Sequence, residues 1–179
     1  RSTLFPYTTL FRSNKLTFVR NVVYDVPNGK INNKIAKDIK FCKFSKGMVQ
    51  MKIGFVSLGC SKNLVNTEVM LKILSDCGYE ITPDDTEADI VVINTCGFIQ
   101  SAKEEAIENI LDVAWLKTHG KLRGIVVCGC LSERYREEIF KEMPEVDALL
   151  GTGSYHKIAE AVGAVARIPS LQTKRIFLR

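Results

Sequence analysis

The 179-residue sequence lacks the features of a membrane or exported protein. No apolar run approaches the roughly 18–20 residues that cross a bilayer. There is also no secretory leader, in which an apolar core precedes a cleavage site of small residues. Apolar residues make up 46% of the chain and charged residues 25%, which is typical of a globular domain. We therefore predict a cytoplasmic protein with one main hydrophobic core and no membrane contact.

Residues 51–179, where the helical and strand patterns lie, also lack the net positive charge of a nucleic-acid-binding domain. Residues 1–50 have a net charge of +8 and residues 51–179 a net charge of −3, within a formal total of +5. The calculated pI of about 8.9 therefore reflects the first 50 residues. Since the remaining residues are slightly acidic, we expect no direct contact with nucleic acid.

The first 50 residues have no sustained helical or strand periodicity. Residues 1–13, RSTLFPYTTLFRS, nearly repeat themselves and resemble a translated sequencing adapter, so we exclude them from the fold. We expect residues 1–50 to be a non-native or disordered leader and the native start to be Met51 or Met48, with a genuine basic arm as the alternative. Residues 51–166 are the predicted domain, and residues 167–179 are predicted to be a truncated tail with no partner segment.

Apolar runs and helical patterns alternate from residue 51 onward. Strands are predicted at 52–58, 89–95, 124–129 and 146–151, where branched apolar residues form short runs. Helices are predicted at 64–78, 101–120, 132–143 and 155–166, and residues 82–85 are predicted to form a loop. Because such strands are joined by helical crossovers, we predict a doubly wound α/β domain. Its mostly parallel, flavodoxin-like sheet should carry helices on both faces.

Six cysteines are more than a cytosolic core of this size requires. Cys60, Cys96 and Cys130 follow the first three predicted strands, and each has a glycine beside it. The carboxyl ends of parallel strands share one edge of the sheet, so these thiols should converge there. Three thiolates suit a [4Fe–4S] cluster in which one iron has no protein ligand. We therefore predict that Cys60, Cys96 and Cys130 are the metal and cofactor ligands.

Other interpretations of the cysteines stay open at this point. Zinc would take a fourth ligand, and none is found, because His119 and His156 are predicted at or near helix ends, away from the strand tips. The CGC run that begins at Cys128 could instead be a redox-active thiol pair. Cys77 and Cys128 are otherwise predicted to be small buried apolar residues, and Cys42 is given no role.

Two weaker patterns accompany the cysteines. The run GTGSY, which begins at Gly151 between a strand and a helix, could hold a phosphate, although a plain turn is the commoner origin of such glycines. A flavodoxin-like module that binds a nucleotide or phosphate is therefore an alternative function. Four polar residues beside the cysteines could donate hydrogen bonds to a bound cluster or cap the following helices: Asn63, Asn66, Asn94 and Thr95.

Three blocks of the sequence resemble the cysteine blocks of the methylthiotransferase family of radical S-adenosylmethionine enzymes. They are SLGCSKNLVNTE (57–68), INTCGFIQSAKEEAI (93–107) and GCLSERY (129–135). The likeness extends over about residues 51–165. It is closer to the branch that modifies a ribosomal protein (RimO-type) than to the tRNA-modifying branch (MiaB-type), which is the alternative. Asn66 and Thr67 stand where that pattern has Asp-Ser.

The resemblance implies an enzyme that methylthiolates the β-carbon of an aspartate in a small-subunit ribosomal protein. It assigns Cys60, Cys96 and Cys130 to an auxiliary [4Fe–4S] cluster whose open iron holds the sulfur or methylsulfide to be transferred. Such enzymes also carry S-adenosylmethionine, a second cluster on a Cys-x3-Cys-x2-Cys motif in a radical domain, and a C-terminal β-rich domain. No cysteine follows Cys130, so we expect a fragment that holds one cluster and is inactive alone.

Overall fold

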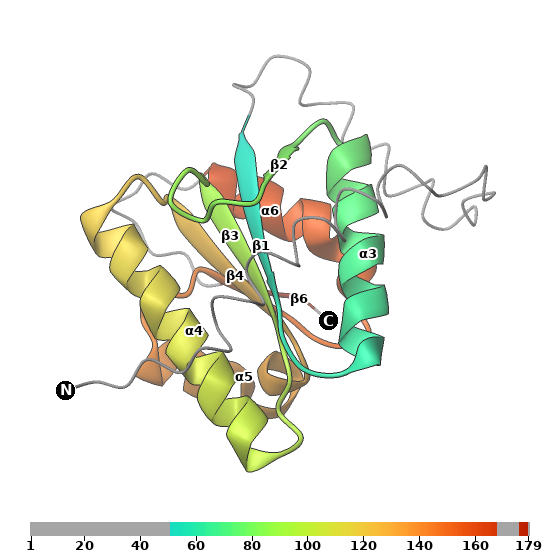
Figure 1. The fold of residues 1–179 in the computed structure, drawn as a ribbon, viewed down its shortest axis with the longest axis vertical. Coiled ribbons are helices and arrows are strands. Elements are labelled where there is room, and N and C mark those ends of the chain that lie inside the picture. The colour runs from blue at the N-terminus through green and yellow to red at the C-terminus, as the bar shows by residue number, and fades with distance from the viewer. Residues whose placement is uncertain (1–50, 168–175, 179) are drawn as a thin grey trace. The chain divides into compact units, whose positions relative to one another are not determined.

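The computed structural model describes residues 51–167 and 176–178, which form a parallel sheet with helices on both faces (Figure 1). The predicted leader, residues 1–50, and most of the predicted tail lie outside the described residues. The described sheet has six strands in the order β2-β1-β3-β4-β5-β6, and every pairing is parallel. The chain adds β2 on one side of β1 and then β3 to β6 on the other side, so the order of the strands switches between β1 and β3. This switch confirms the predicted doubly wound α/β fold.

The sheet has long central strands and short outer ones. The strands are β1 (Lys52–Ser57), β2 (Glu80–Thr82), β3 (Ile90–Thr95), β4 (Gly124–Gly129), β5 (Ala148–Leu150) and β6 (Ile176–Leu178). The helices are α3 (Ser61–Asp76), α4 (Gln100–His119), α5 (Cys130–Glu142) and α6 (Ile158–Ala166), and a 3-10 turn, η2 (Tyr155–Lys157), precedes α6. None of the helices in the described ranges is both long enough and apolar enough to cross a membrane.

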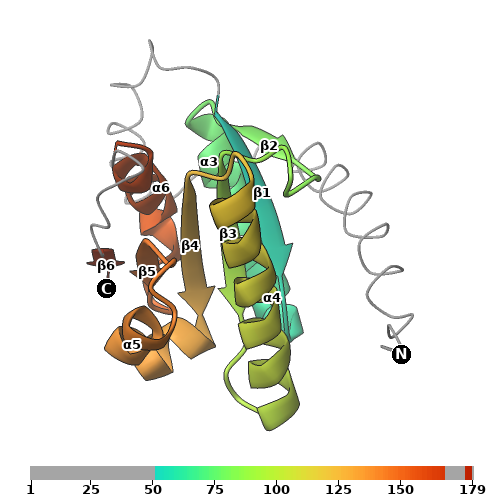
Figure 2. The same cartoon turned by 90° about the vertical axis from the view of Figure 1, so that its left-hand side faces the viewer.

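Burial on two faces explains the composition of the central strands. Every residue of β3 and β4 is buried, and strands covered on both sides are near-continuous apolar runs. Successive side chains of β3 enter different cores: Val91 and Ile93 pack on the side of α4 and α5, whereas Ile90 and Val92 pack on the side of α3 and α6. Figure 2 shows α4 in front of the sheet and α3 behind it. The predicted coverage of both faces is confirmed.

Two edge strands were not predicted. β2 pairs with β1 and β6 pairs with β5, although Thr82 was expected to begin a loop and the tail was expected to have no partner. Each strand has three residues, which are too few for a periodic pattern, and its conformation comes from pairing with the neighbouring strand of the sheet. Those two predictions are therefore wrong at these residues.

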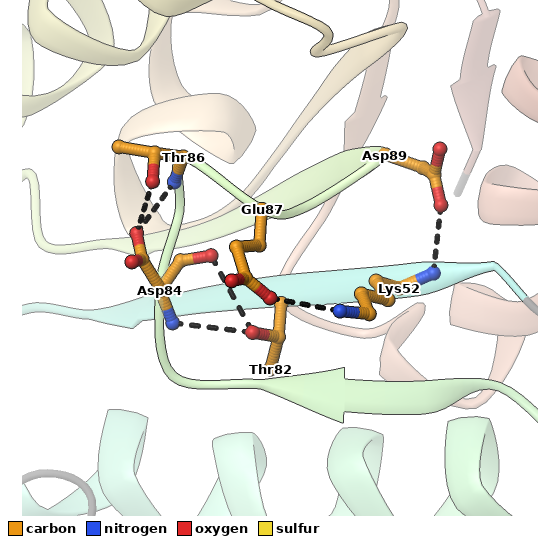
Figure 3. A network of polar contacts seen from close by, with 6 residues as sticks. All are labelled: Lys52, Thr82, Asp84, Thr86, Glu87 and Asp89. Carbon is orange, nitrogen blue, oxygen red and sulfur yellow. Dashed lines mark hydrogen bonds and ion pairs between the residues drawn. The ribbon is translucent and has the colours of Figure 1, made fainter.

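A polar network fixes the loop between β2 and β3 at the amino end of the sheet (Figure 3). Lys52 Nζ lies 2.8 Å from Glu87 Oε2, and the backbone N–H of Lys52 donates to Asp89 Oδ2 over 2.8 Å. Within the loop, Asp84 Oδ1 accepts hydrogen bonds from the backbone N–H and the hydroxyl of Thr86, at 2.9 and 2.6 Å. These bonds align the start of β3 beside the start of β1, at the end of the sheet opposite to the cysteines.

Candidate metal centre

The three predicted ligand cysteines lie at the carboxyl edge of three adjacent strands. Cys60 is the N-cap residue of α3, Cys96 directly follows β3, and Cys130 is the first residue of α5. β3 pairs with β1 on one side and with β4 on the other, so the loop that carries Cys96 lies between the other two. The strand order thus makes neighbours of three segments that are more than 30 residues apart in the sequence.

Close contacts at glycines hold the three loops together. A Cβ added to Gly59 would lie 2.4 Å from Cβ and 3.2 Å from Sγ of Cys96, and one added to Gly97 would lie 2.9 Å from Cα of Leu131. Ordinary van der Waals contact starts near 3.4 Å, so a larger residue would push the loops apart. The first cysteine loop therefore packs on the second, and the second packs on the third.

The ionisation of two thiols reflects this arrangement. The backbone N–H groups of Asn63 and Lys62 donate to the Cys60 sulfur and lower the pKa of that thiol. Burial raises the pKa of Cys130, and the charges of Cys96 and Cys60 raise it further. The three sulfurs are thus close enough to interact electrostatically. Gathering three thiolates costs free energy, which a bound cation would offset.

The surrounding backbone favours negative charge at this edge. Helix α3 begins directly after Cys60, α5 begins at Cys130, and α4 begins four residues after Cys96. The amino end of a helix carries a partial positive charge, which stabilises a nearby thiolate. Lys62 is a cation that lowers the pKa of both Cys60 and Cys130. The sequence analysis did not single out Lys62, although its position two residues after Cys60 was an available signal.

Buried hydrogen bonds connect the backbones of the three loops. Asn63 Nδ2 donates to the carbonyl of Leu58 over 2.9 Å and to the carbonyl of Thr95 over 3.1 Å. Asn94 Nδ2 donates to the carbonyl of Asn63 over 2.9 Å, and Thr95 Oγ1 donates to the carbonyl of Cys128 over 2.6 Å. Leu58, Thr95 and Cys128 each precede one of the three cysteines by one or two residues. The network therefore sets the position of the backbone that carries each thiol.

The capping interpretation of these polar residues is wrong. No described residue makes a side-chain hydrogen bond at the N-cap of α3, α4 or α5. Asn63 and Thr95 bind loop carbonyls instead, and Asn66 donates to the hydroxyl of Tyr155. The Oδ1 atom of Asn94 is buried and has no hydrogen-bond partner within the described ranges. Donation by these residues to a bound cluster stays a prediction.

Tyr155 is a further residue of this edge that sequence reasoning missed. It is the first residue of η2, which follows β5, and burial raises the pKa of its hydroxyl to about 12. The charges of Cys128, Cys130 and Cys60 also raise that pKa, so the ring lies near the thiols. His156 follows Tyr155 in η2, directly before α6, which agrees with its predicted place near a helix end, and its distance from the strand tips stays a prediction.

The donor set suits a cluster of iron and sulfide. Thiolates are the usual protein ligands of such clusters. Among residues 51–167 and 176–178, no three His, Cys, Asp or Glu side chains are arranged to hold one metal ion, as zinc would require with Zn–S distances of about 2.3 Å. A four-iron cluster is a larger body, and its thiolates surround it at wider separations. The glycines beside Cys60 and Cys96 let the cysteine loops approach one another, because an added Cβ would collide with Cys96 or with Leu131.

A hollow lies beside the third cysteine. Its volume is about 290 Å³, and it is lined by Gly97, Phe98, Cys130, Glu133, Arg134 and Thr152. Arg134 Nη1 lies 3.4 Å from the carbonyl oxygen of Gly97, so the guanidinium stays next to the loop of Cys96. Of the three thiols, only that of Cys130 lines the hollow.

The turn that begins at Gly151 is already filled by a carboxylate. The backbone N–H of Thr152 donates to Glu133 Oε2 over 3.2 Å, and a Cβ on Gly151 would lie only 2.1 Å from that oxygen. The other carboxylate oxygen, Oε1, lies 2.8 Å from Arg136 Nη2. This carboxylate already accepts the hydrogen bond of the Thr152 amide that a phosphate would need. Its negative charge would also repel an anion. The arrangement argues against a nucleotide- or phosphate-binding module.

The other two described cysteines are separate from the site. Cys128 is fully buried with its Sγ 3.8 Å from Met70 Sδ, and burial raises its pKa far above the ordinary thiol value. A thiol that stays protonated is a poor partner for disulfide exchange, which argues against a redox pair at Cys128 and agrees with its predicted apolar role. Cys77, the C-cap residue of α3, is half-buried and packs against the core as predicted, but it is disulfide-bonded and therefore not a free thiol.

Asn63→Ala should destabilise the domain by about 2–3 kcal/mol, because the buried carbonyls of Leu58 and Thr95 would lose their donor. Urea denaturation followed by circular dichroism measures this change. Asn109→Ala is the matched control, since that amide donates to a carbonyl within its own helix, α4, on the surface. Equal midpoints for the two variants would contradict the role assigned to Asn63.

The stretch that contains the three thiols matches a known protein family. A family model described as "Uncharacterized protein family UPF0004" matches residues 52–151. This range covers more than half of the chain. It runs from the first residue of β1 to the turn after β5, and therefore contains all three thiol loops.

The chain is also similar to curated proteins named "Ribosomal protein uS12 methylthiotransferase RimO". The protein from Lachnoclostridium phytofermentans is 57% identical over 115 residues, which are 64% of this chain and 26% of the relative. The corresponding protein from Trichlorobacter lovleyi is 53% identical over 113 residues, 63% of this chain and 25% of the relative. That from Pelotomaculum thermopropionicum is 54% identical over 115 residues, with shares of 64% and 26%. The chain thus spans about a quarter of the length of these relatives.

Proposed function

The chain belongs to the family described as UPF0004, and from this premise we propose that it forms the iron–sulfur-binding domain of a methylthiotransferase. The proposed reaction of the whole enzyme is methylthiolation of an aspartate in the small-subunit ribosomal protein uS12. The name shared by the similar proteins supports this substrate over a tRNA substrate. The proposed location is the cytoplasm.

The convergence of Cys60, Cys96 and Cys130 carries the proposal. The three residues come from the ends of three adjacent parallel strands, and the pKa of Cys130 responds to both of the other thiols. Three thiolates would each bind one iron of a [4Fe–4S] cluster and would leave the fourth iron without a protein ligand. The zinc, phosphate and redox-pair alternatives each lack comparable support.

The residues around the thiols would each have a physical task. Cys60, Cys96 and Cys130 would hold the cluster as thiolates, and the cluster, when bound, would supply the sulfur chemistry. The amino ends of α3 and α5 would stabilise the negative charge of these ligands. The hydrogen bonds of Asn63 would hold the loops in place before the metal arrives, which lowers the cost of binding.

Radical formation is assigned to other parts of the enzyme. It requires S-adenosylmethionine and a second cluster, and the sequence after Cys130 contains no cysteine that could bind one. The isolated chain is therefore proposed to load one cluster and to be inactive in methylthiolation.

Anaerobic reconstitution with iron and sulfide tests the proposal. The purified chain should become brown and retain about four iron and four sulfide ions after gel filtration, with the broad visible absorption of a cluster. Iron and acid-labile sulfide assays measure the composition. A chain that retains one zinc ion and no sulfide would contradict the proposed cluster.

A further inference from the structure

Helix α4 presents an apolar stripe to solvent. The α4 stripe consists of Ile107, Leu111 and Trp115, which recur every four residues and therefore lie along one ridge of the helix. Their exposed fractions are 40%, 52% and 60%. Trp115 stacks on His119 with ring centroids 4.6 Å apart, which holds the indole in place at the surface. A row of large exposed apolar side chains is typical of a protein-docking surface.

The charge beside the α4 stripe is negative. Glu104, Glu108 and Asp112 repeat at the same interval of four, offset by one position from the ridge that carries the apolar side chains. They therefore form an acidic row that runs alongside the stripe. Glu105 adds a fourth exposed carboxylate to this side of the helix.

The positive side chains of α4 do not compensate this charge. Lys103 Nζ lies 3.5 Å from the hydroxyl of Tyr135, on the neighbouring helix α5. Lys117 Nζ lies 2.6 Å from Asp147 Oδ2, in a largely buried ion pair. Both lysines thus turn toward the body of the domain, and the outer side of α4 combines four carboxylates with three large apolar side chains.

The surface is continuous with the thiol edge. Phe98 and Ile99 follow Cys96 by two and three residues, and their exposed fractions are 85% and 57%. They lead directly into α4, which runs from the carboxyl edge along one face of the sheet (Figure 1). Figure 2 shows α4 in front of the sheet with no other described helix or strand covering its outer side.

From this arrangement we infer that the outer face of α4 docks a basic protein segment that pairs lysine or arginine with apolar side chains. The inference rests on the proposed function, which makes this segment part of the ribosomal-protein substrate. Proteins that bind RNA are rich in Lys and Arg, because they neutralise phosphates, and so their charge complements the acidic row. RNA itself would be repelled by the same row. Because α4 begins next to the loop of Cys96, a segment bound along this helix would reach the edge of the sheet that carries the three thiols.

The apolar part of the surface is tested by binding of purified uS12 to the chain, measured by fluorescence anisotropy. The double variant Leu111→Ala/Trp115→Ala should bind about 30-fold more weakly, because aromatic and aliphatic anchors dominate such interfaces. Val65→Ala/Val69→Ala is the matched control, since these residues of α3 are 56% and 42% exposed on the other face of the sheet. Equal affinities for both double variants, or no binding by the unaltered chain, would overturn the inference.

The acidic part is tested by a matched pair of charge reversals. Glu108→Lys should weaken binding of uS12 about tenfold at low salt, mainly through slower association, and the difference should shrink as salt is added. Glu160→Lys reverses an exposed glutamate of α6, on the face opposite to α4, and should leave the affinity unchanged. A loss of the same size in both variants would mean that only the net charge matters and would also overturn the inference.

Two further measurements separate this inference from the proposed function. Iron loading of the α4 variants should equal that of the unaltered chain, because α4 carries no ligand. A chain that binds uS12 through α4 but holds no cluster would leave the docking surface intact and refute the proposed function. Sedimentation of the chain alone should show a monomer, and a dimer lost in Leu111→Ala/Trp115→Ala would assign the α4 stripe to self-association instead.

Discussion

Alanine at Cys60, Cys96 or Cys130 will abolish iron loading of the reconstituted chain. Each single change leaves two thiolates, and neither the helix amino ends nor the nearby amides can replace a thiolate as an iron ligand. The retained iron should fall from about four ions per chain to almost none, with loss of the visible absorption. Iron and sulfide analysis after gel filtration measures the effect.

Cys128→Ala is the matched control for these variants. It removes a thiol only two residues from Cys130, but that thiol points into the core and contacts Met70. Iron loading should be unchanged, and the free energy of unfolding should fall by about 1 kcal/mol because a small cavity forms. If all four variants load iron equally, the ligand assignment is wrong. If Cys128→Ala also loses its iron while it stays folded, the assignment is wrong as well.

Gly129→Ala should have the largest effect on stability of any single methyl group added to the site. The residue has φ 100° and ψ −159°, a conformation that is essentially restricted to glycine. A Cβ there would lie 2.2 Å from the carbonyl oxygen and 2.9 Å from the amide nitrogen of Thr95, neither of which can move without breaking the β3–β4 pairing. We expect a loss of about 4 kcal/mol, from backbone strain and overpacking together.

Alanine variants of two other glycines distinguish backbone strain from overpacking as the cause of the lost stability. Gly78 has φ 87° but no atom within 4 Å of an added Cβ, so Gly78→Ala reports backbone strain alone, at about 1 kcal/mol. Gly153 has neither a left-handed φ nor a close neighbour, so Gly153→Ala should be neutral. Urea denaturation of the three variants gives the comparison. Midpoints for Gly129→Ala and Gly78→Ala that coincide would show that the contact with Thr95 is unimportant.

The central strands could be predicted because their pattern is local. β3 and β4 are runs of branched apolar residues that need burial on both faces wherever they lie, and the helices between them have apolar residues at helical spacing. The ends of these strands then located Cys60, Cys96 and Cys130 at one edge. That step needed only the rule that parallel strands end on the same side.

The edge strands and the polar contacts of the site could not be predicted in this way. β2 and β6 have three residues each and become strands through pairing with β1 and β5. The amide of Asn63 was expected either to donate to a bound cluster or to cap a helix, and its bond to Thr95 spans 32 residues of sequence. The carboxylate of Glu133 fills the turn at Gly151 because α5 passes beside that turn, which no spacing of glycines indicates.

The sequence alone determined the central strands and the helices, and which side chains stand at the ends of those strands, since these follow from periodicity within a few residues. Only the tertiary structure decided that β1, β3 and β4 are neighbours, that Asn63 and Thr95 join their loops, and that α4 leaves an acidic, apolar face uncovered among the described residues. The physical reason is that a hydrogen bond or a repulsion acts over a few ångströms in space. Which distant residues come within that range depends on the packing of the whole sheet.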